Sequence, residues 1–454
     1  MHNNKPTVAI AGASGFIGRW FIEKYHQKYN IIAFTRKKTV EKEHRDNVEW
    51  REVEMYSLSS TATALKDADY ALYLVHSMSP SSRLNQGTFE DTDLLLADNF
   101  SRSAEKCGLK HIVYIGGILP EDQSEYSRHL RSRWETEQTL GAYKTPLTAL
   151  RAGVIIGPGG SSFEIVEKLV NRLPIMACPK WTTSCSQPID IDDVLAMIDQ
   201  SFGNEQLFGK AVEIGGSEEI TYMNLLGKTA RVMGKKRKIF SIPFFTLGFS
   251  KLWVSLFSDS SATLVSPLIE SLKHDMTLKK GQTDFFNLNY TPLEKSLQKA
   301  IDQEAPSIPR RQGENAENTV RSYQRLPNPG DKSTEWVANA YPKWLTRTFK
   351  LFLKATYEGD FLVFRLLGIR LLSLKYIPES SDHKRKLFYI VGGKLAKRLD
   401  YGWLEFRSVL DNKYVISAIH EFVPRLPWLI YKYSQAIVHL WVMNAFGKFL
   451  GNQK

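Results

Sequence analysis

The fold of the first part of this chain is decided by Val8-Ala9-Ile10-Ala11-Gly12-Ala13-Ser14-Gly15-Phe16-Ile17-Gly18-Arg19, in which an apolar run leads directly into three regularly spaced glycines. Gly12 permits a tight turn, Gly15 lets the backbone approach an anion, and Gly18 lets the following helix pack against the strand. The start of a helix also favours negative charge. The pattern therefore predicts a dinucleotide site, whose contacts we expect to be Gly12, Ser14, Gly15, Phe16, Ile17 and Gly18.

Apolar runs and helix-like segments alternate after this turn. Strands are predicted at 31–34, 69–75, 111–115 and 148–156, with a helix at 94–107. Such alternation is typical of an α/β fold with a doubly wound, parallel Rossmann sheet. Residues 220–301 have a mixed, mainly helical pattern, and we expect them to form a lobe that covers the substrate.

The length of 454 residues favours two domains, because single cores rarely grow that large. A polar, proline-containing segment at 302–332 is the best linker candidate. We therefore expect a nucleotide-binding domain at 1–301 and a separate module at 333–454.

Bulk composition limits the classes of protein to consider. Three cysteines without close pairing indicate neither a disulfide framework nor a structural zinc site, and we predict no metal. The first residues lack the apolar core of a signal peptide, and the longest apolar run, 239–257, is interrupted by polar residues. We therefore expect a cytoplasmic protein without a membrane-spanning segment.

The positive charge is concentrated near the C-terminus. Residues 331–454 contain 20 Lys and Arg against 10 Asp and Glu, a net charge of +10. Solvation of these charges is the first interpretation, and attraction to acidic lipid headgroups at a membrane surface is the second. We expect no nucleic-acid partner, and the sequence predicts no oligomeric state.

Four further motifs follow the glycine turn in a recognisable order. They are Tyr73-Leu74-Val75-His76-Ser77-Met78, Ile112-Val113-Tyr114-Ile115-Gly116-Gly117, the segment from Arg151-Ala152 to Gly157-Pro158-Gly159, and Gln187-Pro188-Ile189-Asp190. Together they resemble the atypical short-chain dehydrogenase/reductases over residues 5–300. The likeness is strongest to NAD(P)-binding, epimerase-like proteins that are related to the nucleotide-binding accessory subunit of respiratory complex I.

The cofactor choice follows from the residues after the second strand. Arg36 and Lys37 stand where an acidic residue would bind a ribose 2′-hydroxyl, and cations suit a 2′-phosphate. We therefore predict NADP(H), with a solvated basic loop as the alternative. The resemblance also implies cofactor contacts from Val75, His76 and Ser77, although His76 is equally consistent with a structural role.

The catalytic residues of the resembled family are replaced in this chain. That family uses a Ser or Thr after the fifth strand and a Tyr-x-x-x-Lys pair on the next helix. Here Gly116-Gly117 occupies the first region, and His129 and Arg133 take the spacing of the pair. We predict that Arg133 binds the nicotinamide ribose and that His129 acts as a general acid. A solvent-facing helix is the alternative.

The C-terminal module shows strand-like runs at 361–367, 387–391, 404–410 and 414–422, followed by a long helix that begins near Pro427. This order resembles a START/polyketide-cyclase helix-grip domain, an α+β fold. An apolar stripe on the helix is expected to face inward, opposite Lys432, Gln435 and His439. The stripe consists of Trp428, Leu429, Tyr433, Ile437, Leu440 and Trp441.

These features lead to three functional hypotheses. The first is an NADP(H)-dependent oxidoreductase or epimerase-like enzyme that acts on a small apolar carbonyl compound, without the Ser/Tyr/Lys set. The second is a non-catalytic NADP(H)-binding assembly or sensor protein of a membrane-associated complex, since these three residues are missing. The third is a lipid-binding carrier centred on the C-terminal module.

Overall fold

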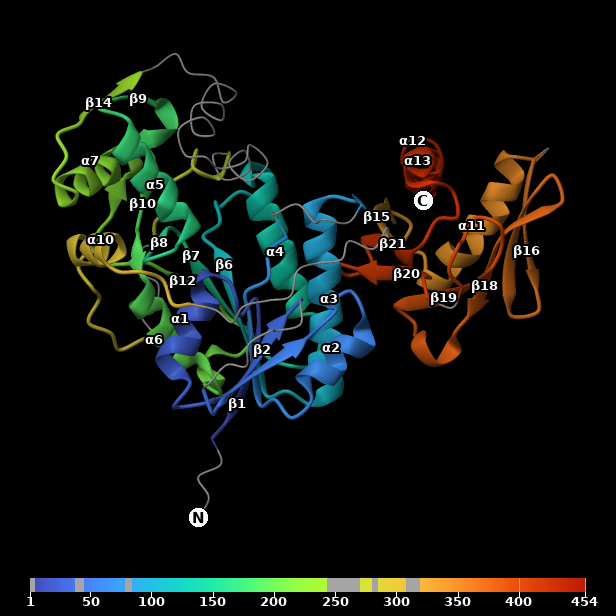
Figure 1. The fold of residues 1–454 in the computed structure, drawn as a ribbon, viewed down its shortest axis with the longest axis horizontal. Coiled ribbons are helices and arrows are strands. Elements are labelled where there is room, and N and C mark those ends of the chain that lie inside the picture. Colours follow the sequence, from blue (N-terminus) through green and yellow to red (C-terminus); the bar gives the residue numbers. More distant parts are fainter. Residues whose placement is uncertain are drawn as a thin grey trace. The chain divides into compact units, whose positions relative to one another are not determined.

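The computed structural model describes residues 5–36, 45–77, 84–242, 270–279, 285–307, 319–350, 352–399 and 401–453. The chain divides into two compact units (Figure 1). Unit 1 comprises residues 1–79 and 99–313, and unit 2 comprises residues 80–98 and 314–454. Among the residues that the structure describes, no helix combines the length and apolar character that a membrane crossing requires.

The described strands of unit 1 form a seven-stranded parallel sheet, which confirms the predicted Rossmann-type α/β fold. Its spatial order is β12 (Ala211–Ile214), β7 (Leu147–Ala152), β6 (His111–Gly117), β4 (Tyr70–Tyr73), β1 (Thr7–Ala11), β2 (Asn30–Thr35) and β3 (Val48–Glu52). The flanking helices are α1 (Phe16–Tyr25), α2 (Leu58–Leu65), α3 (Phe89–Cys107), α4 (Arg128–Leu140) and α6 (Ile191–Ser201).

Burial explains why the strands of this sheet are continuously apolar. Val8, Ile10 and Leu72 have no exposed surface, because helices cover both faces of a doubly wound sheet. On one face, Phe21 of α1 packs in the same core as Val194 of α6. β1 lies between β2 and β4. The chain first adds β2 and β3 on one side of β1, and it then adds β4, β6, β7 and β12 on the other side.

Smaller elements after β7 form the lobe of unit 1. They are β8 (Ile155–Ile156), α5 (Ser161–Arg172), β9 (Ile175–Pro179), β10 (Cys185–Ser186), β11 (Ile189–Asp190), β13 (Ile220–Thr221), α7 (Tyr222–Val232), β14 (Lys238–Ile242) and α10 (Leu293–Asp302). Phe163, Leu225 and Leu297 join α5, α7 and α10 in one apolar cluster. The lobe therefore has a core of its own, and the predicted strand 148–156 is divided into β7 and β8.

Unit 2 is built on an eight-stranded sheet that is antiparallel except for its last pair. Its spatial order is β16 (Leu353–Glu358), β17 (Phe361–Leu366), β18 (Ile369–Tyr376), β19 (Arg385–Gly392), β20 (Trp403–Val409), β21 (Tyr414–Phe422), β15 (Val320–Pro327) and β5 (Leu84–Gln86). The helices of this unit are α11 (Thr334–Thr348), α12 (Trp428–Tyr433), α13 (Gln435–Gly451) and the first part of α3. The predicted α+β character is thus confirmed.

Two segments of unit 2 differ from the sequence-based division of the chain. Residues 320–327 lie inside the segment expected to be a linker, yet they form β15, which pairs with β21 over its whole length. Residues 80–98 precede this unit by more than two hundred positions and contribute β5 and the start of α3. Both depend on partners far along the chain, and local composition does not reveal such pairing.

Most of the stripe predicted to face inward on α12 and α13 is exposed, although Trp428 packs partly against the core and Lys432 is exposed as expected. Trp441 and Ile437, expected to face inward, are 57% and 56% exposed, while Phe446 is fully buried against Tyr341. His439, expected to face water, has a buried Nδ1 with no hydrogen-bond partner among the described residues. The helix is apolar on nearly all sides, so periodicity alone did not identify the buried face.

A buried network of charges joins the sheet of unit 2 to α3. Arg407 has no exposed surface and donates to Asp98 of α3 and to Glu405, at 2.7 and 2.8 Å. Glu405 also accepts from Arg385 at 2.5 Å and contacts His420 at 2.9 Å. Burial alone would raise the pKa of Glu405, but Arg385 and Arg407 hold it well below its ordinary value. The insertion 80–98 is therefore tied to the unit by desolvated ion pairs.

Candidate functional site

The turn after β1 brings two strand ends into contact. Gly12 has a φ of +90°, a conformation that favours glycine, and a Cβ at this position would lie 3.0 Å from the carbonyl carbon and oxygen of Leu74. Leu74 follows β4, the neighbour of β1 in the sheet. The turn therefore lies at the carboxyl edge of β1 and β4, where the strand order of the sheet reverses. Folds of this kind bind ligands at such a position.

The first turn of α1 is arranged to receive an anion. The Gly15 amide donates to the carbonyl oxygen of Gly12 at 2.9 Å, which closes the turn just before the helix. Gly15 offers no side-chain cap, and the first turn of α1 contains no acidic residue. The N–H groups at this helix end thus face no carboxylate of their own turn, and the helix dipole favours a phosphate there.

Gly18 fixes the distance between α1 and the turn. A Cβ at Gly18 would lie 2.6 Å from the carbonyl oxygen of Ala13 and 2.7 Å from that of Gly12. These are backbone atoms, so a side chain cannot be accommodated by a rotamer change. Gly12 and Gly18 therefore have separate steric reasons.

These residues border a small pocket of about 170 Å³. It is lined by Gly12, Gly15, Phe16, Ile17, Gly18, Leu74, Ile115 and Arg133. Six of the predicted site residues are thus brought together, whereas Ser14, Arg36, Val75, His76, Ser77 and His129 are not in its lining. Leu74 and Ile115 were not predicted as contacts, although their positions at strand ends would have indicated them.

Arg133 is held at this pocket by three contacts with β6. Its Nη2 donates to the carbonyl oxygen of Ile115 at 2.6 Å, and its guanidinium carbon lies 5.2 Å from the centre of the Tyr114 ring. The Tyr114 hydroxyl in turn donates to the backbone oxygen of Arg133 at 3.1 Å. A fixed cation therefore stands opposite the glycine turn.

One helical turn before Arg133, His129 pairs with His76. The Nε2 atom of His76 lies 3.1 Å from Nδ1 of His129, so one of these nitrogens donates a proton that the other accepts. Burial, followed by the positive character of His76 and Arg133, lowers the pKa of His129 well below its ordinary value. His129 is therefore neutral at pH 7. Arg128 and Arg131 are exposed, so α4 directs only part of its basic face to solvent.

A side chain at the end of β6, where the resembled family carries one, would be in tight contact with its neighbours. A Cβ at Gly116 would lie 3.3 Å from the Tyr114 ring and 3.5 Å from Arg151, and one at Gly117 would lie 3.2 Å from Leu130. Arg151 is occupied by a bidentate ion pair with Glu137, at 2.6 and 2.9 Å. Gly116 and Gly117 therefore contribute only backbone atoms to this region, and they offer no hydroxyl group.

The predicted selectivity residues lie at the end of β2. Arg36 directly follows the strand and is exposed, as a residue that contacts an adenosine 2′-phosphate would be before binding. Lys37 lies outside the described residues. Cys178 is buried in the lobe, where burial raises the pKa of its thiol to about 11, which agrees with a packing role.

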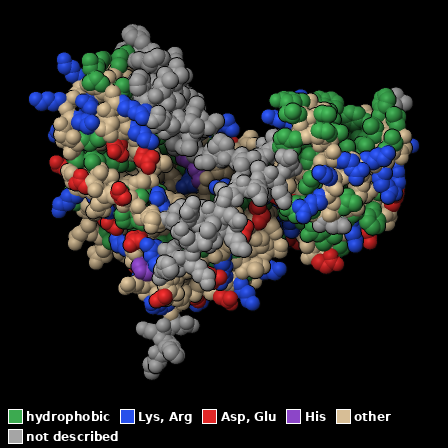
Figure 2. All heavy atoms as spheres, viewed as in Figure 1, with side chains coloured by type: hydrophobic (Ala, Val, Ile, Leu, Met, Phe, Trp, Pro, Cys, Tyr) green, Lys and Arg blue, Asp and Glu red, His purple; other side chains and the backbone are tan. Residues whose placement is uncertain are grey.

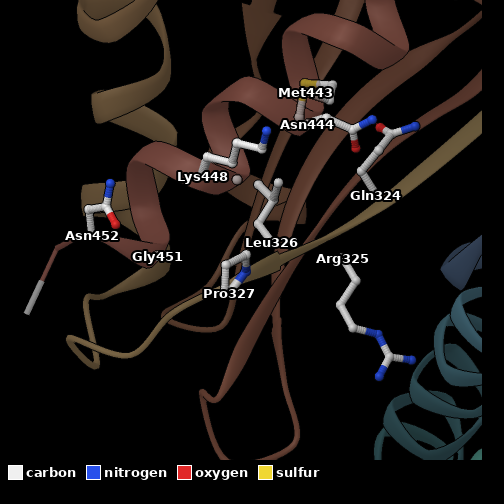
Figure 3. Close-up of a pocket in the computed structure, with 10 residues that line it drawn as sticks. Gln324, Arg325, Leu326, Pro327, Met443, Asn444, Lys448, Gly451 and Asn452 are labelled. Carbon is white, nitrogen blue, oxygen red and sulfur yellow. The ribbon is translucent and has the colours of Figure 1, made fainter.

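Unit 2 contains a larger groove of about 570 Å³ between β15 and α13 (Figure 3). Met443, Asn444, Gly447 and Lys448 line it from the helix. A Cβ at Gly447 would lie 3.5 Å from Leu326, an ordinary contact distance, so α13 packs closely on β15 here without requiring glycine. None of the predicted site residues belongs to this groove.

Comparison with known families agrees with the geometry of the glycine turn. Residues 12–153 match a family model described as NAD(P)H-binding. This segment is therefore an NAD(P)H-binding domain, and the predicted class of cofactor is confirmed. The auxiliary protein GraX of Staphylococcus aureus is 27% identical over 143 residues, which cover 32% of this chain and 43% of that protein. The chain thus spans less than half the length of this curated relative.

Solved structures share the fold at low identity. The triphenylmethane reductase of Citrobacter sp. is 19% identical, with a TM-score of 0.50, over 65% of this chain and 100% of its own. The same enzyme complexed with NADP(H) is 18% identical, with a TM-score of 0.49, over 64% and 99%. A nucleoside-diphosphate-sugar epimerase from Staphylococcus aureus is 13% identical, with a TM-score of 0.48, over 66% and 97%.

Proposed function

We propose that this chain is an NADPH-dependent reductase of the epimerase-like type that acts on a small apolar carbonyl compound. The observation that carries the proposal is the pocket that joins the glycine turn to Arg133. The residues fit a dinucleotide for two reasons. Gly12, Gly15 and Gly18 place no side chain in the turn, and the start of α1 has no acidic side chain. Bound NADPH would supply a hydride to the carbonyl carbon.

Four residues have distinct roles in holding this cofactor. Gly15 and the start of α1 bind the diphosphate through backbone N–H groups. Arg133 hydrogen-bonds the nicotinamide ribose from the opposite side of the pocket. Arg36, with Lys37 beside it in the sequence, pairs with the 2′-phosphate and selects NADPH over NADH.

His129 supplies the proton that a reduced carbonyl oxygen requires. Its neutral imidazole carries one N–H at pH 7, and His76 lies within hydrogen-bond distance on the other ring nitrogen. As Nε2–H of His129 gives its proton to the substrate oxygen, Nδ1 of His129 accepts the proton on Nε2 of His76, and the half-buried His76 takes up a proton from solvent. The pair thus replaces the tyrosine of the resembled family.

Beside α4, a buried apolar cluster supports partly exposed aromatic side chains, and these favour an apolar substrate. Ile118 and Leu119 follow β6 and pack with Leu130 of α4 and with Met276. Tyr126 and Trp134 lie against this cluster. Side chains of this kind bind hydrocarbon surface better than they bind a sugar.

Titration calorimetry of the full chain with NADPH and NADH tests the cofactor assignment. We expect tighter binding of NADPH, and Arg36→Ala should reduce the preference by about tenfold or more because it removes a charge-assisted contact. Arg128→Ala is the matched control, since it removes another exposed arginine of unit 1. Equal affinities in the wild-type chain would refute NADPH selectivity.

Two variants of α4 test the catalytic roles. Arg133→Ala should weaken NADPH binding, whereas His129→Ala should leave binding intact and lower turnover of apolar aldehydes and ketones by about 100-fold or more. Loss of NADPH affinity in His129→Ala would contradict the separation of roles.

A second candidate is a non-catalytic NADPH-binding accessory protein. It is favoured by the glycines at 116 and 117, which provide no hydroxyl group, and by the auxiliary role named for the relative GraX. NADPH binding without turnover of any carbonyl compound in the same assays would select this candidate. The helix-grip identity of unit 2 and the lipid-carrier function stay predictions.

A further inference from the structure

Helices α12 and α13 present a large apolar surface that the described part of unit 2 leaves mostly exposed; Trp441 has one ring contact, with Phe349 at 5.8 Å. Leu429 and Tyr433 of α12 are 69% and 68% exposed, and Val438 and Trp441 of α13 are 58% and 57% exposed. In Figure 2, hydrophobic side chains gather over the helices that Figure 1 labels α12 and α13. We call this surface the C-terminal apolar face; it consists of Leu426, Leu429, Ile430, Tyr433, Ile437, Val438, Leu440 and Trp441.

Another side of α13 packs against the core of its unit. Met443, Phe446 and Leu450 are buried, and Phe446 lies 5.1 Å from Tyr341 and 5.2 Å from Trp344, measured between ring centres. The helix therefore cannot turn its exposed side inward without removing these contacts. An exposed apolar surface of this extent is rare on monomeric soluble proteins and marks an interaction site.

The charged side chains of the C-terminal segment itself have one sign. No Asp or Glu occurs from residue 422 to residue 454. Arg425, Lys432 and Lys448 are all exposed in the same stretch. A surface that combines Trp, Tyr and aliphatic side chains with Lys and Arg is typical of helices that lie in the interface of an anionic membrane.

We propose that the C-terminal apolar face docks on the surface of an anionic phospholipid bilayer. The aliphatic side chains enter the boundary between headgroups and acyl chains, while Trp441 and Tyr433 lie at the headgroup level. Arg425 and Lys432 pair with lipid phosphates. A second copy of the chain is the poorer partner, because two such faces would bring the same basic residues together without any acidic counterpart.

Co-sedimentation of the full chain with vesicles tests this proposal. Vesicles of phosphatidylcholine with one third phosphatidylglycerol are compared with vesicles of phosphatidylcholine alone, at low and high salt. We expect binding to the anionic vesicles that weakens by about tenfold or more without phosphatidylglycerol or at high salt. Trp441 should be quenched by brominated acyl chains, with Trp441→Phe identifying its part of the signal.

Matched substitutions separate the proposed face from general stickiness. Ile437→Ser should weaken vesicle binding by about tenfold, because it removes one buried aliphatic side chain. Ile175→Ser is the control: Ile175 lies on β9 of unit 1 and is 59% exposed, close to the 56% of Ile437. Both variants should keep the NADPH affinity and the thermal unfolding of the wild-type chain, so a folding defect is recognised.

Each other outcome would overturn the proposal. Equal loss of binding in Ile437→Ser and Ile175→Ser, or equal binding to both kinds of vesicle, would do so. A monomer–dimer equilibrium in sedimentation that Ile437→Ser abolishes, without vesicle binding, would assign the face to a second copy. Absence of both vesicle binding and self-association would assign it to another protein.

Discussion

The glycine turn of unit 1 and the helix pair of unit 2 both have clear sequence patterns, but only the first pattern determines its own surroundings. A Cβ at Gly18 would meet backbone atoms of the same turn, so the constraint is local. The apolar pattern of α13 indicates which residues share a face of the helix, but it does not indicate what packs against that face. Protein cores and lipid acyl chains attract the same side chains, so the stripe fits both.

The largest effect we expect tests which side of α13 is buried. Phe446→Ala should destabilise unit 2 by about 3–5 kcal/mol, whereas Trp441→Ala should change its stability by less than about 1 kcal/mol. Hydrogen exchange of peptides from β20 and β21 across a urea titration measures unit 2 specifically. If Trp441→Ala proved the more costly variant, the orientation of the helix would be wrong.

A smaller effect is the pH dependence of stability that a histidine on the same helix causes. Burial lowers the pKa of His439 to about 4. Above pH 6.5 the histidine is neutral in both states. Below it, the unfolded chain takes up a proton that the folded chain does not, so stability falls until about pH 4, by up to about 3 kcal/mol. His439→Leu should remove this part of the pH dependence in urea unfolding at pH 7 and pH 4.5. An unchanged slope would place His439 in water.

The smallest effect compares two helical glycines within unit 1. Gly18→Ala should cost about 2 kcal/mol and weaken NADPH binding by about tenfold, because the new methyl group meets backbone. Gly227 of α7 has only Ile239 near a built Cβ, at 3.9 Å. Gly227→Ala should therefore be neutral or stabilise the chain by about 0.5–1 kcal/mol. Thermal unfolding and calorimetry measure both, and similar costs would remove the steric argument.

Much of unit 1 could be predicted because its rules are short-range. The turn at Gly12 and the apolar strand before it have sequence signatures within a dozen residues, and the parallel order follows from strand and helix alternation. Arg133 was predicted because it takes the place of the lysine in the Tyr-x-x-x-Lys pair of the resembled family, and the structure places it at the pocket. The pairing of His129 with His76 was not predicted, because His129 lies on α4, His76 lies in the loop after β4, and 53 positions separate them.

Unit 2 was harder to predict because its sheet is completed by distant segments. The sequence of β15 is polar and flanked by prolines, so it predicts a linker. Its role as a strand depends on pairing with β21, in which Tyr323 lies opposite Ala418. β5 has only three residues, Leu84–Gln86, too few for any periodicity. Tertiary pairing, and not local preference, decides the structure of both.

The insertion at 80–98 also sets an order of events during synthesis on the ribosome. Asp98 emerges 309 residues before Arg407, and Asp91 emerges 234 residues before Arg325, its partner at 2.7 Å. Gln86 binds the backbone of Ala436, 350 positions later. These groups therefore remain solvated while most of the polypeptide is translated, and the second sheet closes only at the end. A shortened chain that stops before α13 would contain all strands of this sheet but lack Met443, Phe446 and Leu450, so it would expose apolar core that quality-control proteases and chaperones recognise.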